Sequence, residues 1–93
     1  MNVRWTERAL RDLQSLHAYI SQDNEPAAAD TVERILDGLD ALERNPAMGR
    51  KGRVEGTREL VIAPFVVAYR IRHAAVEIIA IIHGARRWPD SFD

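Results

Sequence analysis

The side chains of this sequence best suited to binding chemistry are arginines in its last third. Twelve of the thirteen cationic side chains are arginine. A planar guanidinium forms bidentate contacts with a carboxylate or a phosphate more readily than a lysine ammonium does. Five of these side chains lie along or just beyond strongly apolar segments: Arg58, Arg70, Arg72, Arg86 and Arg87. A sheet made from those segments would present several guanidinium groups to one anionic partner.

His83, three residues before Arg86, could act as an acid or a base. In a regular strand, alternation would place it on the same face as Glu77, Ile79 and Ile81. No residue that would orient it as a catalytic base is evident, so we interpret His83 as a hydrogen-bonded structural histidine.

The sequence predicts neither a metal site nor a cofactor. His17 and His73 fall in separate helical and turn contexts, and there is no cysteine to supply a thiolate ligand. Residues 46–57 contain interspersed glycines and cations, but they lack the spacing and the Lys-Ser/Thr pair of a phosphate-binding loop. We interpret this segment as a mobile basic connector.

The elements that must position these side chains can be read from the hydrophobic pattern. Three runs rich in Val, Ile, Phe and Tyr, at residues 58–62, 65–71 and 76–82, are separated by Pro64 and by a short link at residues 73–75. Such runs with short breaks predict an antiparallel three-stranded meander. Tyr69 is expected to fill the core with its hydroxyl hydrogen-bonded.

The first half of the chain is helical by its period. Thr6 is a suitable N-cap, and Leu10, Leu13, Leu16 and Ile20 recur at spacings of three and four, which predicts a helix ending near Gln22. A turn at residues 23–26 leads into a second amphipathic helix, which Asn45 and Pro46 terminate. So short a connection predicts an antiparallel hairpin whose apolar faces pack on the sheet.

Composition limits the class of protein. The 93 residues, 46% of them hydrophobic, predict one domain spanning residues 1–93. The absence of cysteine, of an apolar signal segment and of a run of about 20 apolar residues predicts a cytoplasmic protein with no membrane contact. Residues 1–45 hold five basic and nine acidic side chains, net −4, and residues 46–93 hold eight and five, net +3. The helical side is therefore expected to be acidic and the sheet side basic.

In this order, the elements resemble the RelE/ParE superfamily of bacterial toxins, and most closely its ParE-like branch. The resemblance covers nearly the whole chain. It depends on Gly56-x-Arg58-Glu59 before the sheet, the Tyr69-Arg70 pair, and Ile82-His83-x-x-Arg86-Arg87 followed by an aromatic residue and Pro89. It implies an α+β fold: a short N-terminal strand near residues 3–5 and a two-helix hairpin packed on a three- to four-stranded antiparallel sheet. It also implies a toxin held inactive by a cognate antitoxin.

The resemblance leaves two classes of target, DNA gyrase for ParE-like members and mRNA on the ribosome for RelE-like members. A nuclease of this kind would have to use Arg58, Arg70, His83, Arg86 and Arg87. The chain has a single lysine, no tyrosine in its C-terminal segment and a pI near 6.3, whereas cleaving ribosome-bound RNA calls for an acid, a base and a basic surface. These points favour a non-enzymatic gyrase inhibitor. A ribosome-dependent mRNA interferase and a degenerate toxin that keeps only antitoxin binding remain open.

These interpretations assign residues to two surfaces. The target is expected to meet Arg86, Arg87 and Trp88, whose indole could anchor a partner or pack back on the helices. A ParD-like antitoxin is expected to bind beside the helical hairpin, where sheet-side arginines meet its acidic side chains: Leu13, Leu16, Ile20, Arg58, Arg70 and Arg72. No sequence-specific DNA binding by the toxin alone is expected.

Overall fold

The computed structural model describes residues 1–92 of the chain, and its elements follow the expected order. They are β1 (Asn2–Trp5), α1 (Glu7–Ser21), α2 (Glu25–Arg44), β2 (Arg50–Lys51), β3 (Arg58–Ile62), β4 (Phe65–Arg72) and β5 (Ala75–His83). The α+β class, the N-terminal strand and the helical hairpin are confirmed. Neither helix in this part of the chain has the length and apolarity that a bilayer span requires.

Both helices begin at side-chain caps, and the cap at Thr6 is the one expected from the sequence. The Thr6 side chain accepts a hydrogen bond from the amide of Ala9 at 3.1 Å, and the Asn24 side chain accepts one from Ala27 at 3.0 Å. Each cap satisfies an amide that the first helical turn leaves without an intrahelical partner. Pro26 in the first turn of α2 is tolerated because that position needs no amide donor.

The sheet is larger than expected and is not wholly antiparallel. Its strand order is β1-β5-β4-β3-β2, and β1 pairs parallel with β5 while the other pairs are antiparallel. The parallel pair is possible because the whole helical hairpin separates β1 from the rest of the sheet, and only a long crossover permits that orientation. The strand that was not expected, β2, is two residues long and lies at one edge of the sheet, within the segment interpreted as a mobile connector. That interpretation is therefore wrong for Arg50–Lys51.

A bulge in β5 changes which side chains share a face. Ala80 pairs with Ala68 and Ile78 pairs with Tyr69, so Ile79 is an extra residue on β5. Ile79 packs in a cluster on one face of the sheet, and Ile81 packs in the core on the other. Ile81 and His83 share the helix-covered face, as expected, but the expectation that Glu77 and Ile79 share it is wrong, because a bulge shifts the alternation of every residue after it.

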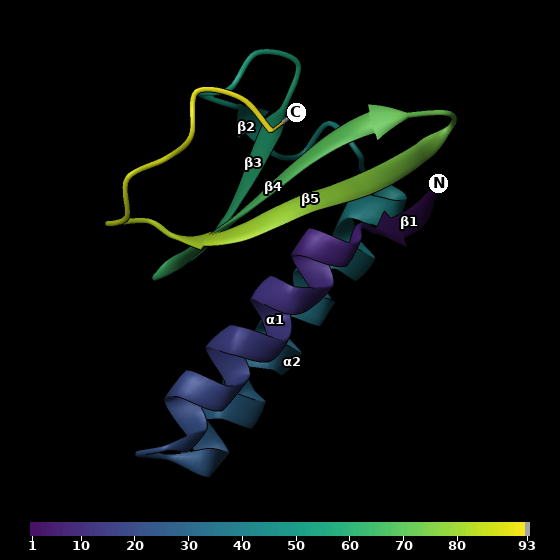
Figure 1. Ribbon diagram of the computed structural model, residues 1–93. Coiled ribbons are helices and arrows are strands. Elements are labelled where there is room, and N and C mark those ends of the chain that lie inside the picture. The colour runs from purple at the N-terminus through teal and green to yellow at the C-terminus, as the bar shows by residue number, and fades with distance from the viewer. Residues whose placement is uncertain (93) are drawn as a thin grey trace.

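The sheet buries apolar side chains on both faces. The helices cover one face, where the main core joins Leu16, Ile35 and Leu39 to Val67, Tyr69 and Ile78. The opposite face, which we call the open face, carries a smaller cluster of Ala68, Ile79, Ala80 and Ile82, with Trp88 and Phe92 packed against it. Figure 1 shows the helices on one side of the sheet and the C-terminal segment crossing the other.

Tyr69 connects the core to the segment after α2. Its side chain is fully buried, its hydroxyl donates to the carbonyl of Pro46 at 2.7 Å, and it accepts from the amide of Gly49 at 2.9 Å. A Cβ at residue 49 would lie 2.5 Å from that hydroxyl, so only glycine permits this approach. The expected role of Tyr69, a core residue with a bonded hydroxyl, is confirmed.

We expect Tyr69→Phe to lower the free energy of unfolding by about 2 kcal/mol, because it leaves a buried amide and a buried carbonyl without a partner. Urea unfolding of the variant and the wild type measures this difference. Tyr19→Phe is the matched control, because the Tyr19 side chain is 74% exposed and its hydroxyl is solvated. Equal losses in the two variants would contradict the structural role of the Tyr69 hydroxyl.

Candidate functional site

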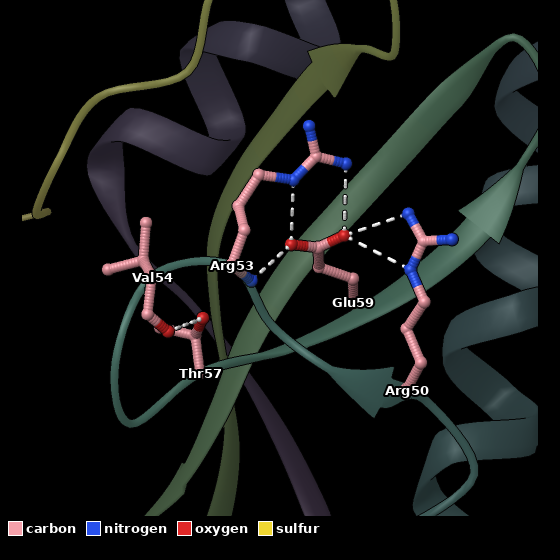
Figure 2. Close-up of polar contacts among 5 residues, drawn as sticks. All are labelled: Arg50, Arg53, Val54, Thr57 and Glu59. Atoms are coloured by element: carbon pink, nitrogen blue, oxygen red, sulfur yellow. Dashed lines mark hydrogen bonds and ion pairs between the residues drawn. The ribbon is translucent and has the colours of Figure 1, made fainter.

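The most extensive polar site on the open face is built around the carboxylate of Glu59, whose side chain is 1% exposed. Arg50 donates to Oε1 from Nε at 3.2 Å and from Nη2 at 2.9 Å. Arg53 donates to Oε2 from its backbone amide at 2.8 Å and from Nε at 3.1 Å, and to Oε1 from Nη2 at 3.2 Å. Figure 2 shows the two guanidinium groups on either side of the carboxylate. This arrangement explains why so short a strand as β2 pairs with β3.

The turn between β2 and β3 sets the position of Arg53. The amide of Gly52 donates to the carbonyl of Thr57 at 2.8 Å, and the Thr57 hydroxyl donates to the carbonyl of Val54 at 2.6 Å. Gly56 has a φ of 81°, which strongly favours glycine. The turn is thereby closed on itself and returns the amide of Arg53 to Glu59 (Figure 2).

The environment of Glu59 favours its charged form. Burial by itself would raise the pKa of this carboxyl, but the hydrogen bonds from the side chain and backbone of Arg53 and from Arg50 outweigh it and lower the pKa below its ordinary value of 4.5. The carboxylate is therefore ionised at neutral pH and fixes both arginines.

A second acidic residue on the open face is paired in the same way. Glu77 on β5 lies between Arg70 on β4 and Arg4 on β1, and the register places the three side by side across the sheet. Arg70 donates to Glu77 at 2.7 Å, and Arg4 donates to its other oxygen. The hydrogen bond from Arg70 is the main cause that lowers the pKa of Glu77. Arg70 is thus already bonded within the fold.

The C-terminal segment, residues 84–92, which we call the tail, turns back over the open face. The amide of Arg86 donates to the carbonyl of His83 at 2.9 Å, and beyond this turn the Trp88 ring packs on the smaller apolar cluster. Packing of Trp88 on the helices, one of the two expected arrangements, is wrong, because the helical face of the sheet is already filled by the main core. Arg86 and Arg87 are both exposed.

The remaining sheet arginines occupy different places. Arg58 lies at the helix-covered side and donates to the carbonyl of Gly49 at 2.8 Å. Arg72 is exposed at the hairpin between β4 and β5, where its Nε contacts His73 at 3.3 Å. The five arginines therefore do not form one cluster, because strand alternation and the two hairpins distribute them over both faces and both ends of the sheet.

His83 lies beside a groove at the end of β5. Its ring is edge-on to Phe65 at 5.6 Å between centroids, and Nδ1 accepts from the amide of Ala85 at 3.1 Å. The expected structural hydrogen bond is present, although the side chain is exposed. The groove has a volume of about 830 Å³ and also contacts Leu16, Ile20 and Arg86.

The five residues named for a nuclease are not brought together. Arg58 pairs with Tyr69 and His83 pairs with Phe65, four residues earlier on β4, a separation of about 13 Å along the strand. Arg70 lies on the face opposite Arg58. Of the five, His83 and Arg86 are the two that line the groove. Within residues 1–92 no cluster of three potential metal ligands occurs.

The apolar residues named for antitoxin binding lie along α1. Leu16 is buried in the main core, and Leu13 and Ile20 are partly buried against it. Leu16 and Ile20 also line the groove, so this groove lies beside the helical hairpin. Tyr19 at its rim is 74% exposed.

Sequence reasoning gave no role to Glu59, Glu77 and Arg53. The available signal was an acid within each of two strongly apolar strands, since a carboxylate at a buried strand position requires a cationic partner. The partners themselves could not be named, because Arg53 comes from a turn and Arg4 from a strand at the other end of the chain.

Known proteins are similar to this chain over most of its length. Residues 3–88 match the family model described as the ParE toxin of the type II toxin-antitoxin system parDE. The chain is 48% identical over 89 residues to toxin Y4kP of Sinorhizobium fredii, covering 94% of this chain and 92% of that protein. It is 34% identical over 84 residues to Toxin RelE2 of Caulobacter vibrioides, covering 90% and 96%.

Solved structures resemble the fold as well. The chromosomal ParDE toxin-antitoxin system of P. aeruginosa includes a chain that superposes with a TM-score of 0.81 at 25% identity, covering 89% of this chain and 95% of that one. The toxin-antitoxin complex RelBE2 of Mycobacterium tuberculosis gives a TM-score of 0.62 at 30% identity, covering 88% and 95%.

The paired carboxylates predict the acid sensitivity of the fold. Because the pKa values of Glu59 and Glu77 lie below 4.5 in the folded state, their stabilisation is complete above that pH and is lost as the pH falls through the folded-state values. At neutral pH we expect Glu59→Gln to lower the free energy of unfolding by about 2 kcal/mol, because charge-assisted bonds to a buried acceptor are lost.

Urea unfolding between about pH 7 and about pH 3 measures this linkage, and the difference between wild type and Glu59→Gln should shrink as the pH falls below 4.5. Glu33→Gln on the exposed side of α2 is the control and should follow the wild-type profile. A difference that stays constant down to the lowest pH would contradict an ionised Glu59.

Proposed function

The chain belongs to the ParE toxin family of type II toxin-antitoxin systems, within the RelE/ParE superfamily, and on this premise we propose that it inhibits growth by binding and poisoning DNA gyrase. In this proposal it acts in the cytoplasm without catalysing a reaction, and a cognate ParD-like antitoxin neutralises it. Arg86 and Arg87 make the contact with gyrase, and Trp88 holds them against the sheet.

The observation that carries the proposal is the distribution of the arginines. Arg50, Arg53 and Arg70 bond to buried or half-buried carboxylates, and Arg58 bonds to backbone carbonyls. Arg86 and Arg87 form an exposed adjacent pair beside a packed indole. An exposed basic pair on a fixed segment suits an acidic or phosphate-bearing surface of a macromolecule.

The antitoxin is proposed to lie in the groove beside the hairpin. Leu16, Ile20 and Phe65 supply apolar contacts there, and His83 and Arg86 border them. An amphipathic segment with acidic residues on one side would match this lining. The similarity to the ParDE system of P. aeruginosa supports a ParD-like partner. Because Arg86 borders the groove and belongs to the proposed gyrase contact, a bound antitoxin would cover part of the toxic surface.

An mRNA interferase is the alternative, and two observations favour it. The chain is similar to proteins named RelE2 and RelBE2. His83 and Arg86 line one groove, and an acid and a cation that cleave RNA together would have to lie on one surface in this way. Against it stands the separation of Arg58 and Arg70 from that groove. Gyrase inhibition therefore remains the proposed function.

The decisive measurement compares the two targets on the purified protein. We expect the wild type to inhibit supercoiling by gyrase and to leave translation intact, and the double variant Arg86→Ala with Arg87→Ala to lose this inhibition. Removal of exposed charges should change the free energy of unfolding by no more than about 0.5 kcal/mol. Arg11→Ala with Arg44→Ala removes two exposed charges from the helices and is the matched control.

Ribosome-dependent cleavage of mRNA with gyrase unaffected would replace this proposal with the nuclease alternative. A double variant that stays fully inhibitory, or that loses inhibition only by unfolding, would remove Arg86 and Arg87 from the contact with gyrase.

For the antitoxin we expect coupled folding. Its C-terminal segment should be disordered alone and become ordered along α1 on binding, and Tyr19→Asp should weaken the complex by about tenfold or more, because it places a charge at an exposed apolar rim. NMR of the isolated antitoxin and titration calorimetry of the pair measure these effects. Leu36→Asp, at another half-exposed apolar position, is the control. A segment already ordered in the free antitoxin would contradict coupled folding.

A further inference from the structure

The position of the tail depends on a small apolar surface in the middle of the open face. Ala68 on β4 and Ala80 on β5 pair directly across the sheet, and both are fully buried. The Trp88 ring packs on this pair together with Ile79 and Ile82. Because alanine side chains are small, two opposed alanines leave room above the sheet for an indole. Larger side chains at these positions would fill that space.

The indole is not held by a hydrogen bond of its own. Within residues 1–92, the buried Nε1 of Trp88 has no acceptor. The contacts of the ring are instead apolar packing, an edge-on contact with Phe92 at 6.4 Å between centroids, and a cation lying over its face.

That cation is Arg53. Its guanidinium carbon lies 3.8 Å from the centroid of the Trp88 ring, while its Nε and Nη2 donate to the carboxylate of Glu59. One planar group thus contacts the ring and a buried anion at once. Because Glu59 is buried and is also bonded by Arg50, it fixes the plane of the Arg53 guanidinium (Figure 2).

Glu59 and the tail are separated by two strands in the chain, and Arg53 comes from the turn before β3. The contact therefore joins the tail to the turn before β3 and to β3 itself, which lie far from the tail in sequence, and no ladder hydrogen bond duplicates it. Removing it would leave Trp88 on the alanine pair but without the stacked cation.

We propose that Arg53, oriented by Glu59, is a positioning residue that fixes Trp88 and thereby presents Arg86 and Arg87 to the target; this rests on the proposed contact of these two arginines with gyrase. Arg53 itself does not touch the target. Its contribution is to keep the tail in one arrangement, so that binding need not first order it.

The chain supplies a matched control. Arg50 and Arg53 both bond to Glu59, and their side chains are 56% and 42% exposed. Only Arg53 is stacked on the Trp88 ring. Arg50→Ala and Arg53→Ala therefore remove the same charge from the same carboxylate, and they differ in the contact with the tail.

The first measurement is hydrogen exchange of the tail amides in the isolated toxin, which involves no target. We expect exchange of residues 85–92 to rise by about threefold to tenfold in Arg53→Ala and to stay near wild type in Arg50→Ala. Glu59→Gln should resemble Arg53→Ala, because the guanidinium is no longer fixed. Equal exchange in the two arginine variants would overturn the positioning role.

The second measurement separates positioning from general damage to the fold. The concentration of toxin needed for half-inhibition of supercoiling should rise in Arg53→Ala and in Trp88→Ala, and the affinity for the antitoxin should fall by a smaller factor, because Ala85 and Arg86 alone of the tail line the groove. Trp88→Phe, in contrast to Trp88→Ala, should retain most of the wild-type inhibition, because a phenyl ring keeps a face for Arg53 and removes the unbonded Nε1. Parallel losses of inhibition and antitoxin affinity, or no rescue by Phe, would overturn the proposal.

The two measurements also distinguish this inference from the function on which it rests. If wild-type toxin leaves gyrase unaffected, the proposed function fails, and the exchange data still decide whether Arg53 fixes the tail. If gyrase is inhibited and Arg53→Ala inhibits as well as wild type, the function stands and the positioning role is wrong.

Discussion

The buried carboxylate of Glu59 is the interaction on which the arrangement of the basic side chains depends. It bonds to Arg50, which brings β2 to the edge of the sheet, and to Arg53, which closes the turn before β3 and lies over Trp88. A charged carboxylate that is 1% exposed is costly unless it is paired and fully hydrogen-bonded, so the two arginines are required by the fold. Part of the apparent basic surface is therefore structural.

Both faces of the sheet are covered, but the apolar packing is much more extensive on one than on the other. The helical hairpin covers one with a large apolar core, and the tail covers part of the other with two aromatic rings. A tail with so few contacts is stabilised far less than the helices are, and segments of this kind lie at the low end of local stability. This difference allows the tail, the segment proposed to contact the target, to be held without being part of the main core.

The same division of the sheet separates the two proposed binding surfaces. The chain belongs to a family of toxins that are paired with antitoxins. On one side, α1 and the end of β5 form an apolar groove, and on the other, the tail presents an exposed pair of arginines. Arg86 borders the groove and belongs to the exposed pair, so the two surfaces adjoin at this residue. An occupant of the groove would lie next to the proposed contact with gyrase, and in this proposal neutralisation by the antitoxin requires no change in the toxin core.

The sequence by itself determined the helices, the cap at Thr6, the three-stranded meander and the family, because these follow from local period and from motifs in order. Only the tertiary structure decided the parallel pairing of β1, the strand at Arg50–Lys51, the face of His83 and the surface under Trp88. The pairing of β1 and the surface under Trp88 depend on segments distant in the chain, the short strand depends on the ion pairs of the buried Glu59, and the face of His83 depends on one extra residue at Ile79. Local propensity contains no information about these features, because the energy that decides them comes from partners that the chain brings together only on folding.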